Sequence, residues 1–189
     1  MKITKELLKE KGACADGYRD FLKEYPVDKY PDGVEYQELL DCCAEKNFSY
    51  GSWLLGAFGK TDENRKIDGD LIAEKGIIFA GQLEVKGCIK AGEGIEAGWG
   101  IKAGEGIEAG RGIKAGGGIK AGWGIKAGAG IKAGDGIEVG DGIEVGDEFG
   151  IYAGLCRRIT DKTQRKIIAK ERPKNIMCGE FEEKKDDAV

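Results

Sequence analysis

The sequence of 189 residues contains no histidine. Histidine is the usual general base near neutral pH and the commonest metal ligand, so its absence removes the side chain on which many catalytic and metal sites depend. No nucleophilic side chain stands beside an evident base either. We therefore expect a protein that is not an enzyme, with no catalytic residue, no metal site and no cofactor.

The chain also lacks the cysteine spacing of a zinc site and any long apolar run. No stretch approaches the roughly 20 apolar residues of a membrane span, and residues 1–6 do not read as a secretory signal. We expect a cytoplasmic protein with no membrane partner and with reduced, structural thiols; a metal, redox or catalytic cysteine is the alternative. The six cysteines form neither a Cys-x-x-Cys nor a Cys/His pattern, and they are Cys14, Cys42, Cys43, Cys88, Cys156 and Cys178.

What the sequence does have is a six-residue repeat, Gly-Ile-Lys/Glu-Ala-Gly-X, which runs from Leu71 to about Ala153. A hexapeptide period is typical of a parallel β-solenoid. Two apolar residues with a charge between them predict a short strand that faces inward on one side. The two glycines of each unit would form the corners, by adopting positive φ and by letting coils approach closely. Continued without an insertion, the pattern makes Phe149 and Ile151 the last inward pair.

The charges of the repeat predict the size of a coil. They follow the first apolar residue of each unit and would stack about 4.8 Å apart between coils, where opposite charges stabilise and like charges destabilise. A coil of three hexads, roughly 18 residues, gives the largest excess of opposite over like pairs, compared with coils of two or four hexads. We therefore expect a three-sided prism of about 4.7 coils over residues 71–154, with one alternating column of Lys90, Glu108, Lys126 and Glu144.

The repeat resembles the hexapeptide-repeat, left-handed β-helix superfamily, many members of which are acyltransferases. Here the sizes are exchanged: Ala103 precedes Gly104 where that family has a large aliphatic residue, and Ile101 takes the other inward position. The exchange leaves the handedness open. Residues 81–87 also resemble the polymer-forming bactofilins, which implies self-assembly.

The rest of the chain has a different composition. Residues 1–60 have few glycines and show helical periodicity, which predicts four helices, the first of them starting at Ile3. The complete expectation is a mainly β protein, a three-sided parallel β-solenoid with a small N-terminal α-helical domain and a C-terminal cap. We divide it into a helical module (1–60), a linker (61–66), the solenoid (67–156), a C-terminal cap (157–178) and an acidic tail (179–189).

Three segments resemble uncharacterised phage and prophage proteins that place a short helical segment before a long Gly-Ile-x-Ala-Gly array. The segments are residues 12–18 (Gly-Ala-Cys-Ala-Asp-Gly-Tyr), 52–55 (Ser-Trp-Leu-Leu) and 151–156 (Ile-Tyr-Ala-Gly-Leu-Cys). The resemblance implies a mobile-element origin and an accessory or anti-defence role.

Two groups of residues are candidates for binding. Trp99, Arg111 and Trp123 occupy the variable corner position, and exposed Trp and Arg are typical interface anchors; alternatively, each indole lies over a neighbouring glycine corner. Three corner aspartates do not follow the calcium-binding nonapeptide pattern. The second group belongs to a basic stretch that could bind phosphate or could be the solvated face of the cap, and its members are Arg157, Arg158, Lys162, Arg165 and Lys166.

Three function classes follow. The first is a non-catalytic binding or scaffold protein, a phage or prophage anti-defence inhibitor or decoy that presents a rigid solenoid surface to a host protein complex. The second is a self-assembling, bactofilin-like protein that associates through the solenoid, and the third is an enzyme of unrecognised type. With 30 Lys+Arg against 34 Asp+Glu, the chain as a whole does not attract nucleic acid. Binding of nucleic acid is expected only through residues 157–174.

Overall fold

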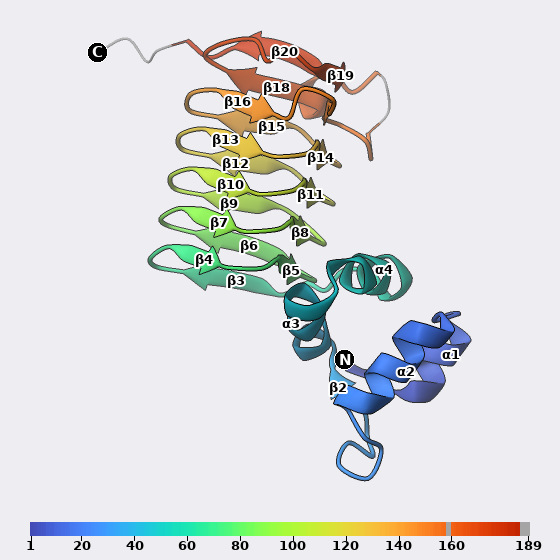
Figure 1. Ribbon diagram of the computed structural model, residues 1–189. Coiled ribbons are helices and arrows are strands. Elements are labelled where there is room, and N and C mark those ends of the chain that lie inside the picture. The colour runs from blue at the N-terminus through green and yellow to red at the C-terminus, as the bar shows by residue number, and fades with distance from the viewer. Residues whose placement is uncertain (158–159, 186–189) are drawn as a thin grey trace. The chain divides into compact units, whose positions relative to one another are not determined.

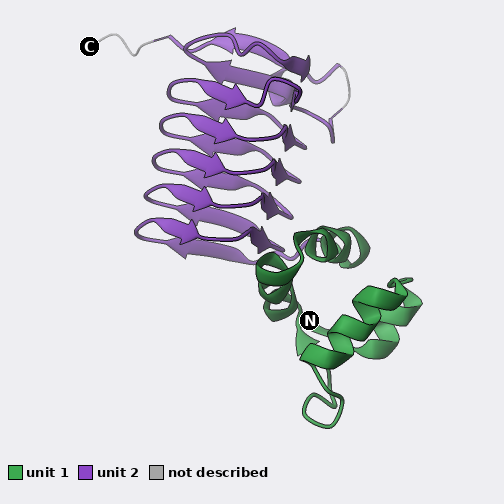
Figure 2. Ribbon diagram, viewed as in Figure 1, with its two compact units in different colours: residues 1–59 green, residues 60–189 purple. Residues whose placement is uncertain are grey.

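The computed structural model describes residues 1–157 and 160–185, and it divides the chain into two compact units. The first unit is Met1–Gly59 and the second is Lys60–Val189 (Figure 2). The first unit is mainly helical and the second consists of stacked β-strands (Figure 1). The predicted fold class is confirmed: three parallel sheets wind into a solenoid with about 18 residues per turn, and a separate N-terminal unit contains four helices.

The first unit contains four helices and a two-stranded antiparallel sheet. Thr4 caps the first helix, because its Oγ1 accepts a hydrogen bond from the Leu7 amide at 3.3 Å. Ile3, predicted to begin that helix, instead pairs with Val34 in the small sheet. The elements are β1 (Lys2–Ile3), α1 (Lys5–Glu10), α2 (Ala15–Glu24), β2 (Val34–Glu35), α3 (Tyr36–Lys46) and α4 (Phe48–Phe58).

The second unit is built from a five-stranded, a six-stranded and a seven-stranded parallel sheet, named here by strand number. The five-stranded sheet contains β4 (Leu71–Ala73), β7 (Ile89–Ala91), β10 (Ile107–Ala109), β13 (Ile125–Ala127) and β16 (Ile143–Val145). The six-stranded sheet contains β5 (Ile77–Phe79), β8 (Ile95–Ala97), β11 (Ile113–Ala115), β14 (Ile131–Ala133), β17 (Ile151–Tyr152) and β19 (Ile176–Cys178). The seven-stranded sheet contains β3 (Asn64–Ile67), β6 (Gln82–Val85), β9 (Ile101–Ala103), β12 (Ile119–Ala121), β15 (Ile137–Val139), β18 (Lys166–Ala169) and β20 (Glu180–Glu183).

The register between coils is the predicted one over the repeat. Ile107 pairs with Ile89 in the coil before and with Ile125 in the coil after, so equivalent residues of successive coils are three hexads apart. Isoleucine and alanine at the inward positions form one continuous core, in which Ile107 is 1% exposed and Ala109 is 2% exposed. A buried isoleucine contributes about 1.5–3 kcal/mol, so the stability of the unit comes from stacking many coils.

The glycine that follows each inward alanine of the repeat is required by close approach and not by backbone conformation. The described glycines with positive φ are Gly12, Gly33, Gly59, Gly154 and Gly179. The repeat corners therefore do not use positive φ, contrary to the sequence-based expectation. At Gly122 a Cβ atom would lie 1.9 Å from the Gly104 carbonyl oxygen of the preceding coil, so a side chain has no room there.

The solenoid begins earlier than the repeat indicates. Residues 64–66, expected in a linker, belong to β3, which pairs in parallel with β6. Arg65 stands opposite Leu83 and Ile67 opposite Val85, so the polar segment continues the register of the inward positions. The guanidinium carbon of Arg65 lies 4.5 Å from the centre of the Phe79 ring. This stacking lets a charged side chain take an inward position at the end of the core.

The solenoid also ends later than expected, after a two-residue insertion. Ile131 pairs with Ile151, whereas an unbroken repeat would pair it with Phe149. A turn in which the Phe149 amide donates to the Gly146 carbonyl takes up the extra residues. Phe149 is 45% exposed, so its predicted inward position is wrong; Ile151 and Ala153 are the inward pair, both fully buried.

The segments expected to be a cap and an acidic tail extend the stack. β18 pairs with β15 and with β20, and β19 pairs with β17, all in parallel. The seven-stranded sheet therefore spans about seven turns, against the predicted 4.7 coils. The sequence loses its hexapeptide pattern here because loops of other lengths separate these strands.

Candidate protein-binding surface

The three corner residues predicted to bind a partner lie on three different corners of the prism. Trp99 joins β8 to β9, Arg111 joins β10 to β11, and Trp123 joins β12 to β13. Their backbones belong to separate columns of hydrogen bonds between coils: the amide of Trp99 donates to Gly81, that of Arg111 to Glu93 and that of Trp123 to Glu105. Trp99 and Trp123 flank the seven-stranded sheet, and Arg111 lies on the corner opposite that sheet.

Trp99 is engaged within its own unit. The Lys60 ammonium nitrogen lies 2.8 Å from the centre of the indole ring, which is a cation–π contact. Trp99 is 37% exposed and borders a shallow groove of about 420 Å³ over the seven-stranded sheet. One face of this indole is therefore already covered.

Arg111 forms an ion pair along its corner column. Its Nη1 lies 3.7 Å from a carboxylate oxygen of Glu93, one coil away. Both side chains are partly exposed, so the pair contributes little to stability. Arg111 does not share a groove with either tryptophan.

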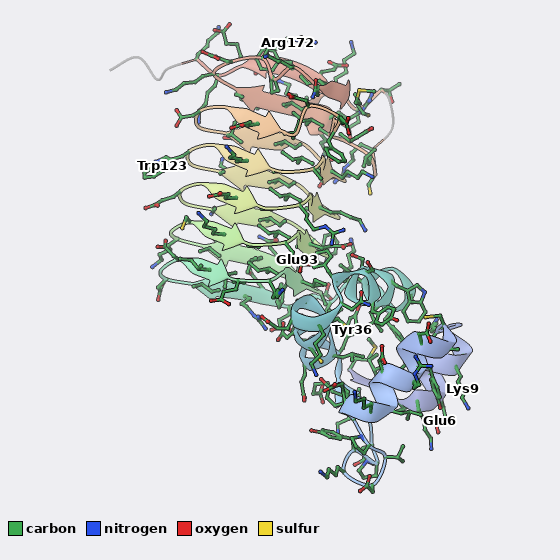
Figure 3. All side chains as sticks on the ribbon, viewed as in Figure 1. Glu6, Lys9, Tyr36, Glu93, Trp123 and Arg172 are labelled. Carbon is green, nitrogen blue, oxygen red and sulfur yellow. The ribbon has the colours of Figure 1, made fainter. Side chains whose placement is uncertain are left out.

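Trp123 is the most exposed tryptophan of the solenoid and projects from its edge (Figure 3). It is 59% exposed. The indole borders a groove of about 540 Å³ over the five-stranded sheet. The floor of this groove includes Gly106, Gly124 and Gly142, which carry no side chain, and its far wall is the row of charges on that sheet.

We use the name five-stranded face for the outward surface of the five-stranded sheet. Its outward residues, in coil order, are Ile72, Lys90, Glu108, Lys126 and Glu144. The charged residues form the predicted alternating column. The Lys90 and Glu108 side chains are 2.9 Å apart, and those of Lys126 and Glu144 are 3.2 Å apart. The hydrogen bond from Lys90 to Glu108 raises the pKa of Lys90, so its charge persists across the physiological range.

Ile72 adds an apolar side chain to the five-stranded face. It is 65% exposed at the first strand of the sheet. Sequence analysis did not single it out, because only its outward place in β4 distinguishes it from the buried isoleucines. The five-stranded face thus carries one exposed large apolar residue, Ile72, and Trp123 lies on the corner at its edge.

The other two faces carry neighbouring like charges. On the seven-stranded sheet Lys102 stacks on Lys120, and on the six-stranded sheet Lys114 stacks on Lys132. Ion pairs surround these contacts: Glu84 with Lys102 at 2.7 Å, Lys120 with Glu138 at 2.9 Å, and Glu96 with Lys114. The Lys102 ammonium lowers the pKa of Glu84 by a hydrogen bond. Regular alternation of charge is a property of the five-stranded face.

Three residues of the basic stretch are paired with carboxylates, and a fourth contacts a thiol. Arg157 is hydrogen-bonded to Asp135, which raises the pKa of Arg157. Lys166 pairs with Glu182, and Lys170 lies 3.1 Å from Asp141. Arg165 donates to the Cys178 sulfur. These contacts give Arg157, Arg165, Lys166 and Lys170 local partners within the solenoid unit.

The remaining predicted residues of this stretch are placed differently. Lys162 is exposed just before the short 3₁₀ turn Thr163–Arg165. Arg158 lies outside the described residues. Of the four predicted basic residues that the structure describes, Arg157 and Lys166 are ion-paired, Arg165 contacts Cys178 and Lys162 is exposed.

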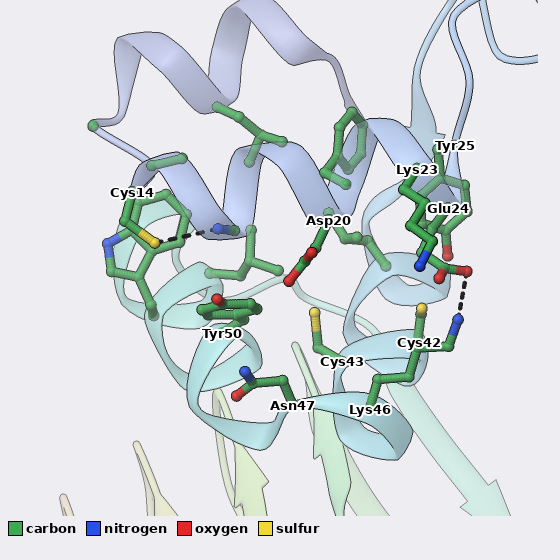
Figure 4. Close-up of a pocket in the computed structure, with 18 residues that line it drawn as sticks. Cys14, Asp20, Lys23, Glu24, Tyr25, Cys42, Cys43, Lys46, Asn47 and Tyr50 are labelled. Atoms are coloured by element: carbon green, nitrogen blue, oxygen red, sulfur yellow. Dashed lines mark hydrogen bonds and ion pairs between the residues drawn. The ribbon is translucent and has the colours of Figure 1, made fainter.

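A separate pocket of about 310 Å³ lies within the helical unit (Figure 4). Aromatic and aliphatic side chains of α1–α4 line it, together with the ion pair of Glu24 and Lys46. Burial raises the pKa of the Cys43 thiol to about 12. Burial and the Cys42 thiol also raise the pKa of Tyr25. The Cys43 thiol is thus protonated at neutral pH and is a poor nucleophile.

The other thiols have local structural roles where contacts are seen. Cys14 caps α2, since its sulfur accepts a hydrogen bond from the Gly17 amide at 3.4 Å. Burial and Asp70 raise the pKa of Cys88. All six cysteines are free thiols. Within residues 1–157 and 160–185, no three His, Cys, Asp or Glu side chains lie close enough together to hold a metal ion.

A search for membrane spans gives a negative result over the described part of the chain, where every helix is too short or too polar to cross a bilayer. Comparison with protein-family models, with curated proteins and with solved structures gives no match. The function must therefore be inferred from the chain's own surfaces.

Proposed function

We propose that the chain is a non-catalytic protein-binding scaffold, whose rigid solenoid presents the five-stranded face to a partner protein. The absence of histidine and the protonated Cys43 thiol support a role other than catalysis. The main support is that Trp123, which is 59% exposed, borders a groove lined by glycines. A row of alternating charges lies next to this groove. An exposed Trp beside a groove is typical of an interaction anchor.

Rigidity supports this proposal. The groove is formed by strands that are hydrogen-bonded to both neighbouring coils, so the partner does not have to order a flexible loop. A preformed surface loses less conformational entropy on binding. Trp99, partly covered by Lys60, is a weaker candidate than Trp123.

The test compares two tryptophan substitutions on one scaffold. The chain is used as bait, its partner is identified by mass spectrometry, and the affinity for the purified partner is measured for the wild type, Trp123→Ala and Trp99→Ala. We expect Trp123→Ala to cost roughly 2 kcal/mol, about thirtyfold in Kd, and Trp99→Ala to have a much smaller effect. Equal losses would indicate a footprint that includes both corners. Wild-type affinity in both variants would reject the proposal.

Within this class we propose an anti-defence role in a phage or prophage, with a host protein complex as the partner. Its support is the resemblance of residues 12–18, 52–55 and 151–156 to phage-type repeat proteins. Expression of the chain in bacteria with a known defence system should raise phage plating efficiency, and Trp123→Ala should abolish that gain.

A second candidate is a self-assembling structural protein that stacks end to end. The terminal strands of the seven-stranded sheet support it, because β3 carries Arg65 and Lys66 while β20 carries Glu180, Glu182 and Glu183. The two ends would attract each other. Against it, the five-stranded sheet stops at β16, so the last turns lack a strand on that side and offer an incomplete platform.

A further inference from the structure

We infer that the five-stranded face binds the same face of a second copy of this chain, with the two solenoids antiparallel. This inference rests on the proposed function, and it names a second copy of the chain as one protein that this surface binds. It follows from the order of charges on the face, which is Lys90, Glu108, Lys126 and Glu144.

An alternating column with an even number of charges is complementary to itself when reversed. A twofold axis that lies in the contact plane, parallel to the strands and between β10 and β13, reverses the order of coils in the second copy. Lys90 then faces Glu144 of the second copy, and Glu108 faces Lys126. Two-fold symmetry repeats each contact, so the four charges of each copy all meet an opposite charge.

The two central residues, Glu108 and Lys126, lie on either side of the twofold axis. Within one chain, Glu108 forms an ion pair with Lys90, and Lys126 forms an ion pair with Glu144. The axis passes between these two ion pairs. In the dimer each of the four charges gains one opposite neighbour from the other copy, and the two contacts between Glu108 and Lys126 lie nearest the axis. These two positions therefore control the association.

The other faces do not have this property. On the seven-stranded sheet, a twofold axis along the middle strand β12 sets Lys120 against Lys120 of the other copy. An axis between β9 and β12 sets Lys102 against Lys120 of the other copy. On the six-stranded sheet it sets Lys114 against Lys132. Like charges across an interface weaken association, so both faces disfavour self-pairing.

The shape of the face fits the same arrangement. The axis brings Trp123 of each copy over the corner that carries Glu105 in the other, next to the glycine floor at Gly106. The floor lacks side chains, so it leaves room for the indole. Trp123 would then be partly removed from water in both copies.

The size of the face predicts a weak dimer. The four strands that face each other about this axis, about 4.8 Å apart and with units of six residues, give roughly 400 Å² per copy. Stable dimers bury about 800 Å² per partner. We therefore expect exchange between monomer and dimer at micromolar concentrations, with an association that weakens as salt screens the charges.

The experiment is sedimentation equilibrium of the full chain at roughly 20 mM and 500 mM salt. The wild type is expected to reach the mass of two chains in low salt and to dissociate at least tenfold more readily in high salt. Glu108→Lys creates two Lys–Lys contacts by symmetry, and Lys126→Glu creates two Glu–Glu contacts. Each variant is expected to weaken the dimer at least tenfold.

The decisive experiment mixes the two charge-reversed variants. In an equimolar mixture of Glu108→Lys and Lys126→Glu, every contact between the two different chains is again opposite in charge, so a heterodimer should form from two monomeric variants. The double variant should likewise regain a homodimer. Glu138→Lys and Lys102→Glu are the matched controls, because they make the same changes of net charge on the seven-stranded sheet, and they should dimerise as the wild type does.

Other outcomes overturn the inference. If the wild-type chain stays monomeric in low salt, the dimer does not exist. That result leaves the proposed function to be tested separately, by the affinity of Trp123→Ala for a partner protein. A dimer that neither Glu108→Lys nor Lys126→Glu weakens uses another surface. Mass that keeps growing beyond two chains indicates end-to-end stacking. Two folded monomeric variants that do not associate on mixing exclude the twofold arrangement.

Discussion

Arg65 stacks its guanidinium on the ring of Phe79 at the first turn of the solenoid, with 4.5 Å between the guanidinium carbon and the ring centre. A similar contact occurs at the last turn, where the guanidinium carbon of Arg172 lies 5.6 Å from the centre of the Phe181 ring. The core is thus bordered at both ends by a cation over an aromatic ring, which covers apolar surface and remains hydrated.

Substitution of Arg65 should destabilise the solenoid end. Arg65→Ala removes the cation–π contact and the covering aliphatic stem, so we expect the free energy of unfolding to fall by about 1 kcal/mol. Arg65→Lys should lose less, because the stem and the charge remain. Urea denaturation followed by circular dichroism measures both, and an unchanged midpoint for Arg65→Ala would show that the contact does not contribute.

Ile113→Asp should unfold the solenoid. Ile113 is 1% exposed in the middle of the core, so the substitution buries a carboxylate without a partner. Lys132→Glu is the matched control on the same sheet: it replaces a like-charge stack with Lys114 by an opposite pair and removes the contact of the Lys132 ammonium with the Tyr152 ring, so stability should change by less than about 1 kcal/mol. A β-type circular dichroism spectrum and a wild-type thermal transition for Ile113→Asp would refute the inward register.

Two glycine positions should respond oppositely to alanine. At Gly122 a Cβ would lie 1.9 Å from the Gly104 carbonyl oxygen, whereas at Gly142 no heavy atom lies within 4 Å. We expect Gly122→Ala to cost about 1–3 kcal/mol by forcing two coils apart. Gly142→Ala should be neutral or stabilising by up to about 1 kcal/mol, because it restricts the unfolded chain. Urea midpoints compare them, and equal effects would contradict the close-approach argument.

Cys43 should react slowly with alkylating agents. Its pKa is raised to about 12, so at pH 8 its thiolate fraction is very small. Cys14 and Cys156 are exposed and should be modified first by iodoacetamide, as peptide mapping can show. The unfolded thiol ionises near its ordinary pKa of about 8.5, so the native state holds an extra proton above that pH. Stability should therefore fall as pH rises from about 9 towards 12, and less so in Cys43→Ala.

The sequence predicts the repeat region well because every unit meets the same physical demand. Isoleucine and alanine must face inward, and charges stack at intervals of three hexads, so period and register follow from the pattern. The ends were predicted less well. Arg65 is polar, yet it continues the inward register, because an end position needs only one covered side. Phe149 looks like an inward residue, yet two inserted residues place it on the surface.

The candidate surface was predicted in part. Trp123 and the alternating column could be recognised from the sequence, since their spacing is part of the repeat. The separation of Trp99, Arg111 and Trp123 onto three corners follows once three hexads make a coil, although groove boundaries do not. The contact between Lys60 and Trp99 could not be predicted, because Lys60 lies outside the repeat.

The stacking of equivalent residues at an interval of three hexads limits how such a chain can change its length. Gain or loss of three hexads adds or removes a whole coil and leaves every later residue on its original face. Gain or loss of one hexad preserves the isoleucine core but rotates everything that follows by one side of the prism. Trp123 would then move to the next corner, and the alternating charges would be divided between two sides. The core therefore tolerates the gain or loss of a single hexad, whereas the surface pattern is preserved only when a whole coil of three hexads is gained or lost.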